Sequence, residues 1–307
     1  MGAITLAKKY LPILDEIYRK EALTSPLEVN PMNINFKGAN KVELFEYDDF
    51  SGMGDYSRTG GFVAGAVTNV WREYSLEQDR GRSFQVDVMD NEETMEMLFG
   101  KLMAYFFKHK VIPEMDAYRF ATLAATSGIG GASADITVGT TDVPGLIDTA
   151  EGALDDAEVP REGRLLYLSE TAYRGLKAKI TRVLANENGV NRQIEVYDDM
   201  IVRRVPTSRF CTGITLYDGT TSGQEAGGYL FTASTSKPIN FVIIGAEAAT
   251  AITKHSTTRL WSPEENQSAD AWKFDYRVYH DILVPKQKVK GIYVHKASTG
   301  LASNIVG

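Results

Sequence analysis

The stretch RGRSFQVDVMDNEETMEMLFGKLMAYFFKHKVIPEMDAYRF, residues 80–120, decides the fold. Apolar and polar residues alternate from Phe84 to Val88, which predicts a half-buried strand. Asp90 and Glu93 then predict a helix start, because these two residue types at this spacing satisfy free backbone N–H groups. The apolar residues that follow recur at three- and four-residue steps and comprise Met95, Leu98, Phe99, Leu102, Tyr105 and Phe106. We therefore expect a strand followed by a long helix.

Proline sets the predicted end of this helix. Pro113 lacks a backbone N–H and its ring crowds the preceding turn, so it kinks or stops the helix at about Ile112. From Asp90 to Ile112 the helix would be about 33 Å long. No second helical pattern lies nearby, and we expect a sheet to pack against this helix.

The composition excludes several classes of protein. The chain has 307 residues and a net charge of −7, which argues against a dedicated nucleic-acid-binding protein, since such proteins carry a basic surface. No apolar run approaches the roughly 18 residues that a membrane helix needs, so we expect no membrane partner. Cys211 is the single cysteine, which excludes an internal disulfide and a cysteine-based zinc site.

A long hairpin is predicted before the decisive stretch. Lys41–Tyr47 and Ala66–Leu76 have strand-like composition, and four glycines lie between Ser51 and Gly61 in the segment that joins them. Isolated hairpins are marginally stable in water, and this one has few apolar residues. We therefore expect it to lean on another structure, such as a second chain.

The rest of the chain predicts a mixed α+β organisation. Helices are expected at Pro144–Ala157, from a Ser169 cap through Leu184, and at Ala246–Lys254, with a short strand at Leu165–Leu168. Further along, strands are expected at Thr258–Ser262, Trp272–Leu283 and Gly291–Val294.

Patterns of catalysis and metal binding are missing from the sequence. The four histidines are scattered, and none has metal-ligand spacing to another. No nucleophile elbow or phosphate-binding loop occurs. We therefore predict no catalytic, cofactor-binding or metal-binding residues, and we expect that the protein is not an enzyme.

The order of several strings resembles one known family. These strings are GDYSRTGGF (54–62), VTNVWREYSLEQDRGRSFQVDVMD (67–90), NEETMEMLFGKLMAYFFKHK (91–110), SADAWKFDYRVYHDILVPK (268–286) and GIYVHK (291–296). Together they resemble the major capsid proteins of tailed bacteriophages, which have the Hong Kong 97-type fold. The resemblance extends over nearly the whole chain.

The resemblance implies an α+β fold with defined parts. The N-arm would be residues 1–35, and the extended β-hairpin loop residues 36–85. A peripheral domain with a long spine helix, kinked at Pro113, would comprise 86–125 and 256–285. An axial domain would comprise 126–255 and 286–297, followed by a flexible C-terminal tail at 298–307. The first strand begins close to Met1, so we expect no scaffolding domain within this chain.

The resemblance also implies a function and partners. The chain would assemble with itself into pentamers and hexamers of an icosahedral head that encloses double-stranded DNA without sequence specificity. Portal, scaffolding and decoration proteins are further implied partners; the shell would assemble in the host cytoplasm and belong to the virion capsid. We expect subunit contacts at nine residues, namely Asp55, Tyr56, Arg58, Phe62, Arg80, Arg82, Glu264, Glu265 and Arg277.

Three alternatives or refinements remain at this point. An encapsulin-like cellular nanocompartment would use the same fold and differ in its cargo. An α+β enzyme without a recognisable motif would be a soluble monomer that forms no particles. Some members of the family cross-link subunits through a lysine on the hairpin, but this chain has no lysine between Lys41 and Lys101, so we expect a shell without covalent cross-links.

Overall fold

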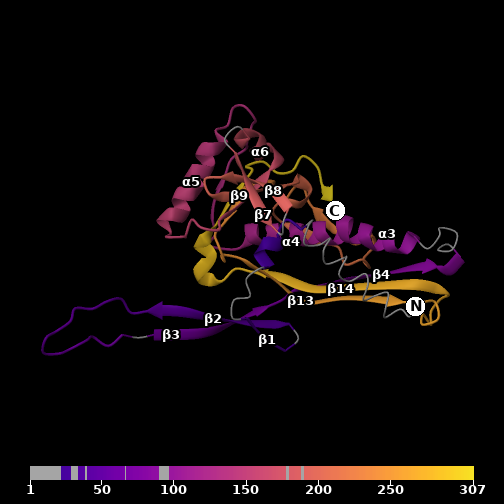
Figure 1. Cartoon of the computed structure of the whole chain (residues 1–307), viewed down its shortest axis with the longest axis horizontal. Coiled ribbons are helices and arrows are strands. Elements are labelled where there is room, and N and C mark those ends of the chain that lie inside the picture. Colours follow the sequence, from indigo (N-terminus) through magenta and orange to yellow (C-terminus); the bar gives the residue numbers. More distant parts are fainter. Residues whose placement is uncertain are drawn as a thin grey trace.

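A computed structural model of the chain describes residues 22–28, 34–38, 40–65, 67–89, 97–177, 180–187 and 190–307. The fold is α+β, and the described residues form four sheets. Figure 1 shows a body of strands and helices, a long flat part in which α3 lies along β13, β14 and β4, and a slender hairpin that projects to one side. The first 21 residues of the expected N-arm and the predicted cap at Asp90 lie outside the described residues.

The long helix continues beyond Pro113, so of the two outcomes predicted there, a kink or a stop, the stop at Ile112 is wrong. It consists of α3 (Met97–Phe106), a π-helical turn η2 (Phe107–Val111) and α4 (Ile112–Ala125), which follow one another without a break. The N–H of Ile112 bonds the carbonyl of Phe107, five residues back. Proline in a regular α-helix crowds the carbonyl four residues back. The wider π turn ends directly before Pro113, which sits in the first turn of α4, where proline is tolerated.

A three-stranded antiparallel sheet packs against this helix, as expected. Its order is β13 (Thr250–Trp261), β14 (Ala271–Leu283), β4 (Gln78–Asp87). The shared core contains Met103, Phe107, Val111 and Met115 of the helix and Leu260, Phe274, Tyr276 and Val278 of the sheet. Phe84 lies edge-on to Phe106 with ring centroids 4.8 Å apart.

The structure differs from two sequence-based predictions in the three-stranded sheet. Residues 78–85 were expected in the hairpin, but they form β4 and pair with β14 over their whole length. Ala246–Lys254 was expected to be a helix, and that prediction is wrong because β13 begins at Thr250. The β-branched residues Thr250, Ile252 and Thr253 favour a strand, and β14 offers them a partner.

A seven-stranded sheet forms the centre of the body. Its order is β5 (Gly130–Ser133), β15 (Ile292–Lys296), β12 (Ile239–Ile244), β6 (Leu165–Ser169), β9 (Met200–Val205), β8 (Val190–Tyr197), β7 (Thr181–Glu187). Helices α5 (Val143–Asp156) and α6 (Glu170–Leu176) cover one face, and the end of α4 covers the other. Leu166 and Leu168 point to the first face and Tyr167 to the second, so β6 reads as an unbroken apolar run. The predicted start of the helix after Ser169 is confirmed, with the Ser169 hydroxyl accepting from the N–H of Ala172. Its predicted end at Leu184 is wrong, because α6 ends at Leu176 and Thr181–Glu187 form β7, which pairs with β8.

The C-terminal residues, which were expected to form a tail, pair and pack with the body. β16 (Ile305–Val306) pairs with β11 (Tyr229–Phe231), which pairs in turn with β10 (Ile214–Leu216). Leu301 and Ile305 pack on a small core with Tyr229, Phe231 and Cys211. The N–H groups of Ser298 and Thr299 both donate to Asp135. Residues 298–307 therefore have both apolar and polar partners in the body.

The predicted hairpin is confirmed and gains a third strand. β2 (Lys41–Phe50) and β3 (Val67–Ser75) are antiparallel, and β1 (Ile34–Lys37) pairs with the first part of β2. Single 3-10 turns occur at η1 (Ser25–Glu28), η3 (Thr207–Arg209) and η4 (Lys286–Gly291). Figure 1 shows the far half of the hairpin extending well beyond every other element.

Candidate assembly surfaces

The root of the hairpin is fixed to the body by an apolar contact. Val42 and Leu44 of β2 are buried, and they pack against Leu76, Ile252 and Leu283. The last two residues belong to β13 and β14. The hairpin therefore leaves the body from a packed core rather than from a loose linker.

Polar contacts strengthen the same root. Asp281 of β14 accepts hydrogen bonds from the N–H of Glu77 at 2.9 Å and from the hydroxyl of Tyr118 at 2.9 Å. The hydroxyl of Tyr279 donates to the carbonyl of Leu76 at 2.7 Å. Burial, together with the Asp281 carboxylate, raises the pKa of Tyr118, which keeps the hydroxyl a donor at every physiological pH. These bonds join β14, α4 and the junction of β3 with β4 at one point.

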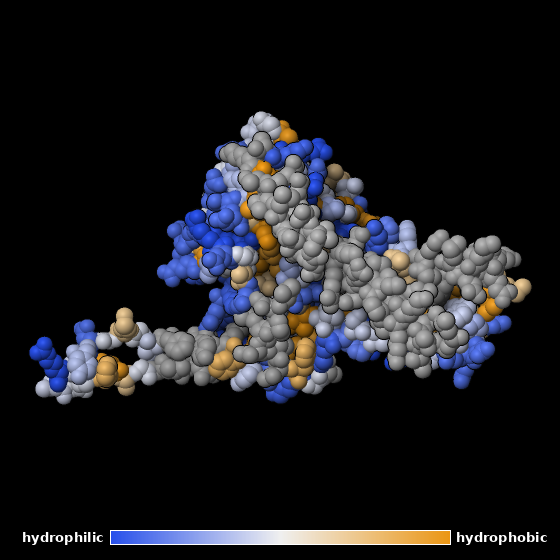
Figure 2. All heavy atoms as spheres, viewed as in Figure 1, coloured by the Kyte–Doolittle hydropathy of each residue, from blue (hydrophilic) through white to orange (hydrophobic). Residues whose placement is uncertain are grey.

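The tip of the hairpin is preformed and apolar. Ser57 and Gly61 exchange backbone hydrogen bonds of 3.1 Å and 2.8 Å, and Gly61 takes a positive φ of 75° that favours glycine. The rings of Tyr56 and Phe62 meet with centroids 5.0 Å apart. Phe62 is 90% exposed, and the other exposed apolar residues of the tip are Met53, Tyr56 and Val63. Figure 2 shows hydrophobic residues at the end of the arm, far from the body. Apolar groups gathered on an exposed surface mark an interaction site.

The structure places Asp55, Tyr56, Arg58 and Phe62 together at this tip. All four belong to the same short turn, in which Asp55 and Arg58 are also exposed. The tip thus combines an apolar centre with one acidic and one basic side chain. Charged residues around an apolar centre are typical of protein interfaces.

Arg80 and Arg82 lie on the body and contact residues of their own chain. Arg80 Nε donates to Glu114 of α4 at 2.7 Å, and its Nη1 donates to the carbonyl of Tyr217 at 2.7 Å. Arg82 donates to the carbonyl of Glu225 at 3.2 Å. Both arginines therefore hold the loop between β10 and β11 against β4. The sequence shows this loop to be rich in glycine, but it carries no signal that two arginines reach its carbonyl groups.

Glu264, Glu265 and Arg277 occupy two further places. The two glutamates are exposed in the turn between β13 and β14. This turn lies at the opposite end of the sheet from the hairpin root, since Trp261 pairs with Lys273 while Thr250 pairs with Leu283. Arg277 lies on the exposed sheet face and makes a two-pronged ion pair with Asp79. The nine residues expected at contacts therefore fall into four places: the hairpin tip, the loop contact of Arg80 and Arg82, the turn between β13 and β14, and the sheet face at Arg277.

Two of the four histidines are buried inside the body. His280 and His295 are both buried, and burial lowers the pKa of His280 to about 3, so this ring stays neutral near pH 7. Within the residues that the structure describes, no three histidine, cysteine, aspartate or glutamate side chains come together as metal ligands. No helix among the described residues has the length and apolar character needed to cross a bilayer.

The fold of this chain is similar to that of several solved structures. No protein-family model matches the sequence, and no curated protein matches it either. A structure from Gordonia phage Cozz matches with a TM-score of 0.56 at 12% identity, covering 91% of this chain and 87% of the other. The capsid structure of cyanophage P-SCSP1u matches with a TM-score of 0.53 at 11% identity, covering 89% and 87%. The chain has the Hong Kong 97-type fold.

The Hong Kong 97-type fold is shared more widely than among phages. A virus-like particle from Pyrococcus furiosus matches with a TM-score of 0.53 at 10% identity, covering 94% of this chain and 99% of the other. At such low identities the likeness establishes the Hong Kong 97-type fold alone. The use that this chain makes of the fold has to be argued from its own surfaces.

Proposed function

We propose that this chain is the major capsid protein of a tailed phage, and that its copies assemble into the pentamers and hexamers of an icosahedral head. The observation that carries the proposal is the hairpin, which is fixed at its root and ends in an apolar tip that the described part of the chain leaves exposed. The match to the capsid structure of cyanophage P-SCSP1u supports the same use of the fold. The protein would act as a structural component of the virion capsid, assembled in the host cytoplasm.

The geometry of the hairpin favours a repeating assembly. A projecting tip on one copy and a receiving surface elsewhere on the next copy form a head-to-tail contact, and such contacts form rings when the rotation from copy to copy closes on itself. Burying a large apolar side chain such as Phe62 stabilises a contact by about 1.5–3 kcal/mol. A rigid root favours this contact, because little orientational freedom is lost when the tip docks.

The remaining surfaces are assigned in the same framework. We assign α3, β4, β13 and β14 to the peripheral domain, and the seven-stranded sheet with α5 and α6 to the axial domain around the ring centre. The turn with Glu264 and Glu265 would meet other rings at the junctions between them. Portal, scaffolding and decoration proteins would be further partners of the shell.

The shell would enclose double-stranded DNA without binding it tightly. The net charge of −7 supports this, because strong DNA binding requires many lysines and arginines that neutralise phosphates. Free subunits should therefore bind duplex DNA weakly at physiological salt. Tight binding with a steep dependence on salt concentration would contradict this part of the proposal.

The tip provides the test of the proposed function. In the double variant Phe62→Ser, Val63→Ser, subunits should fold as the wild type does but form few closed particles in electron micrographs. The control is Val138→Ser, which changes an exposed valine of similar accessibility between β5 and α5. Normal particles from the tip variant would contradict the proposal, as would equal losses in the tip variant and the control.

A cellular nanocompartment shell is the second candidate. It is favoured by the match to the Pyrococcus furiosus virus-like particle, which extends over 99% of that chain. The two candidates differ in cargo, so particles purified from the native source separate them. Packaged DNA of uniform length supports the phage head, whereas an enclosed protein cargo supports the compartment.

A further inference from the structure

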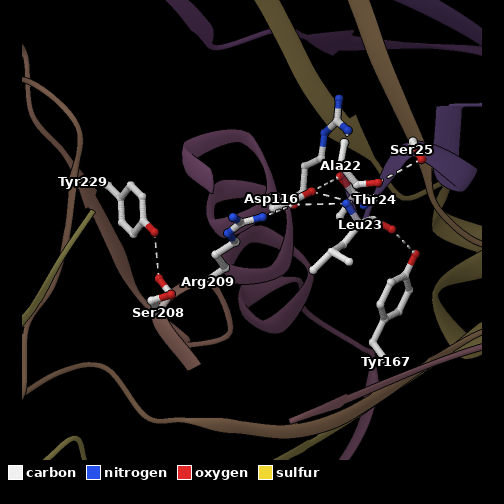
Figure 3. Close-up of polar contacts among 10 residues, drawn as sticks. Ala22, Leu23, Thr24, Ser25, Asp116, Tyr167, Ser208, Arg209 and Tyr229 are labelled. Atoms are coloured by element: carbon white, nitrogen blue, oxygen red, sulfur yellow. Dashed lines mark hydrogen bonds and ion pairs between the residues drawn. The ribbon is translucent and has the colours of Figure 1, made fainter. Parts of the chain in front are cut away.

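A buried carboxylate on the long helix receives the segment Ala22–Glu28. Asp116 is fully buried in α4. It accepts hydrogen bonds from the N–H of Leu23 at 3.2 Å, the N–H of Thr24 at 3.1 Å and the hydroxyl of Thr24 at 2.7 Å. Figure 3 shows Leu23 and Thr24 on one side of Asp116 and Arg209 on the other. The carboxylate thus accepts hydrogen bonds from two main-chain N–H groups and one hydroxyl of a segment more than ninety positions away in sequence.

Three further side chains complete this contact. Arg119, fully buried one turn along α4, donates to the Thr24 hydroxyl at 2.9 Å and to the Glu28 carboxylate at 2.5 Å. Tyr167 of β6 donates to the carbonyl of Leu23 at 3.1 Å. Arg209 donates to Asp116 at 3.3 Å. The Leu27 side chain is buried in the main core.

These contacts have the character of peptide recognition. Main-chain hydrogen bonds hold the segment, one hydroxyl and one carboxylate give selectivity, and a leucine fills an apolar site. We propose that α4, β6 and η3 form a peptide-binding groove whose ligand is the segment Ala22–Glu28, and that this segment is a separable clip rather than an inseparable part of the core.

The clip has a consequence for the preceding residues. If the chain forms shells as proposed above, the clip fixes the position of Ala22, to which the first 21 residues of the chain are joined. An empty groove would leave Asp116 and Arg119 buried with fewer partners, which is costly. Release of the segment Ala22–Glu28 from the groove therefore costs free energy.

The experiment cuts the chain in place. A protease recognition sequence is inserted between residues 29 and 33 of the full-length protein, and unassembled subunits are cleaved and passed over a size-exclusion column. The fragment that ends at the cut should co-elute with the rest of the chain. An excess of a fluorescent peptide spanning residues 20–30 should then replace it slowly. Because the readout uses unassembled subunits, it is independent of whether shells form.

Matched variants test the specificity of the groove. Thr24→Val removes the hydroxyl that contacts both Asp116 and Arg119, and it should speed fragment release by roughly tenfold or more. Ser25→Ala is the control, since that hydroxyl bonds the carbonyl of Ala22 within the segment itself. Retention in Thr24→Val equal to that of the wild type would overturn the proposal. A wild-type body that loses the fragment at once, or that unfolds after cleavage, would overturn it as well.

Discussion

The N–H of Glu77 donates to Oδ2 of Asp281 at 2.9 Å, at the point where the hairpin joins the body. The other oxygen of Asp281 accepts from the hydroxyl of Tyr118 and from the N–H of Ile282. One buried carboxylate therefore links the hairpin root, the long helix and the central strand of the three-stranded sheet. This arrangement explains why a long, exposed hairpin can have a defined direction.

Replacement of Asp281 should weaken the root. In Asp281→Asn the amide group cannot accept all three hydrogen bonds, and a buried donor loses its partner. We expect the free energy of unfolding to fall by about 1–3 kcal/mol and amide exchange at Glu77 to become faster. Asp270→Asn, a change at an exposed turn, should alter neither quantity. Unchanged exchange at Glu77 in Asp281→Asn would contradict this account of the root.

Arg80 should stabilise the fold of each subunit on its own, before any assembly. Its contacts with Glu114 and with the carbonyls of Tyr217 and Gly228 lie within one chain and are largely shielded from water. Arg80→Ala should lower the free energy of unfolding by about 1–3 kcal/mol, whereas Arg82→Ala, at an exposed position, should change it by less than about 0.5 kcal/mol. Urea unfolding of unassembled subunits measures both. Equal effects of the two substitutions would show that the burial of Arg80 is not what matters.

Glu151 should make the stability of the body depend on pH. Burial, with the nearby Asp198 carboxylate, raises the pKa of Glu151 to about 7 from its ordinary value of 4.5. Asp148 opposes its ionisation as well, while Arg164 favours it. The unfolded chain releases the proton near pH 4.5 and the folded chain near pH 7. The free energy of unfolding therefore falls as the pH rises across this window.

Glu151→Gln removes this dependence, because glutamine resembles the protonated acid. The variant should match the wild type at pH 4 and exceed its free energy of unfolding by about 1–3 kcal/mol at pH 8. Glu162→Gln, at an exposed position, serves as the control and should have the same pH profile as the wild type. A wild-type stability that rises between pH 5 and 7 relative to Glu151→Gln would have the wrong sign for this mechanism.

Mature particles should contain no covalent links between subunits. The hairpin has no lysine beyond Lys41, and Lys41 is paired with Glu73 at the root. Arginine at the tip stays protonated and cannot act as the nucleophile. A denaturing gel of boiled, reduced particles should give one band at 33.9 kDa. A ladder of multimers would show that another residue pair forms a bond.

Local patterns predicted much of the fold. The alternation before Val88 and the Ser169 cap each depend on neighbours in sequence, and each appears in the structure. The apolar stripe of the long helix was predicted only in part: Phe106 packs against the sheet, but Tyr105 is exposed, and the buried residues Met103 and Phe107 were not in the predicted stripe. The residues around Pro113 left both a kink and a stop open, and only the family resemblance implied that the helix continues. The π turn that precedes the proline leaves no simple pattern in the sequence. Ala246–Lys254 was misjudged because its alanines favour a helix, while its strand partner lies about thirty residues downstream.

The surfaces were harder to predict than the fold. The exposed tip with Tyr56 and Phe62 follows from its glycine-rich sequence, since few apolar residues are available nearby to cover it. The intramolecular role of Arg80 depends on carbonyl groups more than 130 positions away, and such contacts are set by tertiary structure. The groove for Thr24 was missed for the same reason, because Asp116 and Arg119 look like ordinary charged helix residues in sequence.

The most direct test of the central claim is the state of the purified full-length protein, measured by light scattering together with cryo-electron microscopy. The account predicts rings or closed shells in which the hairpin of each copy lies on a neighbouring copy, with the tip residues Tyr56 and Phe62 covered. A monodisperse monomer of 33.9 kDa that forms no particles at any concentration or salt would contradict it. Shells whose hairpin tips remain exposed to solvent would contradict the role assigned to the tip.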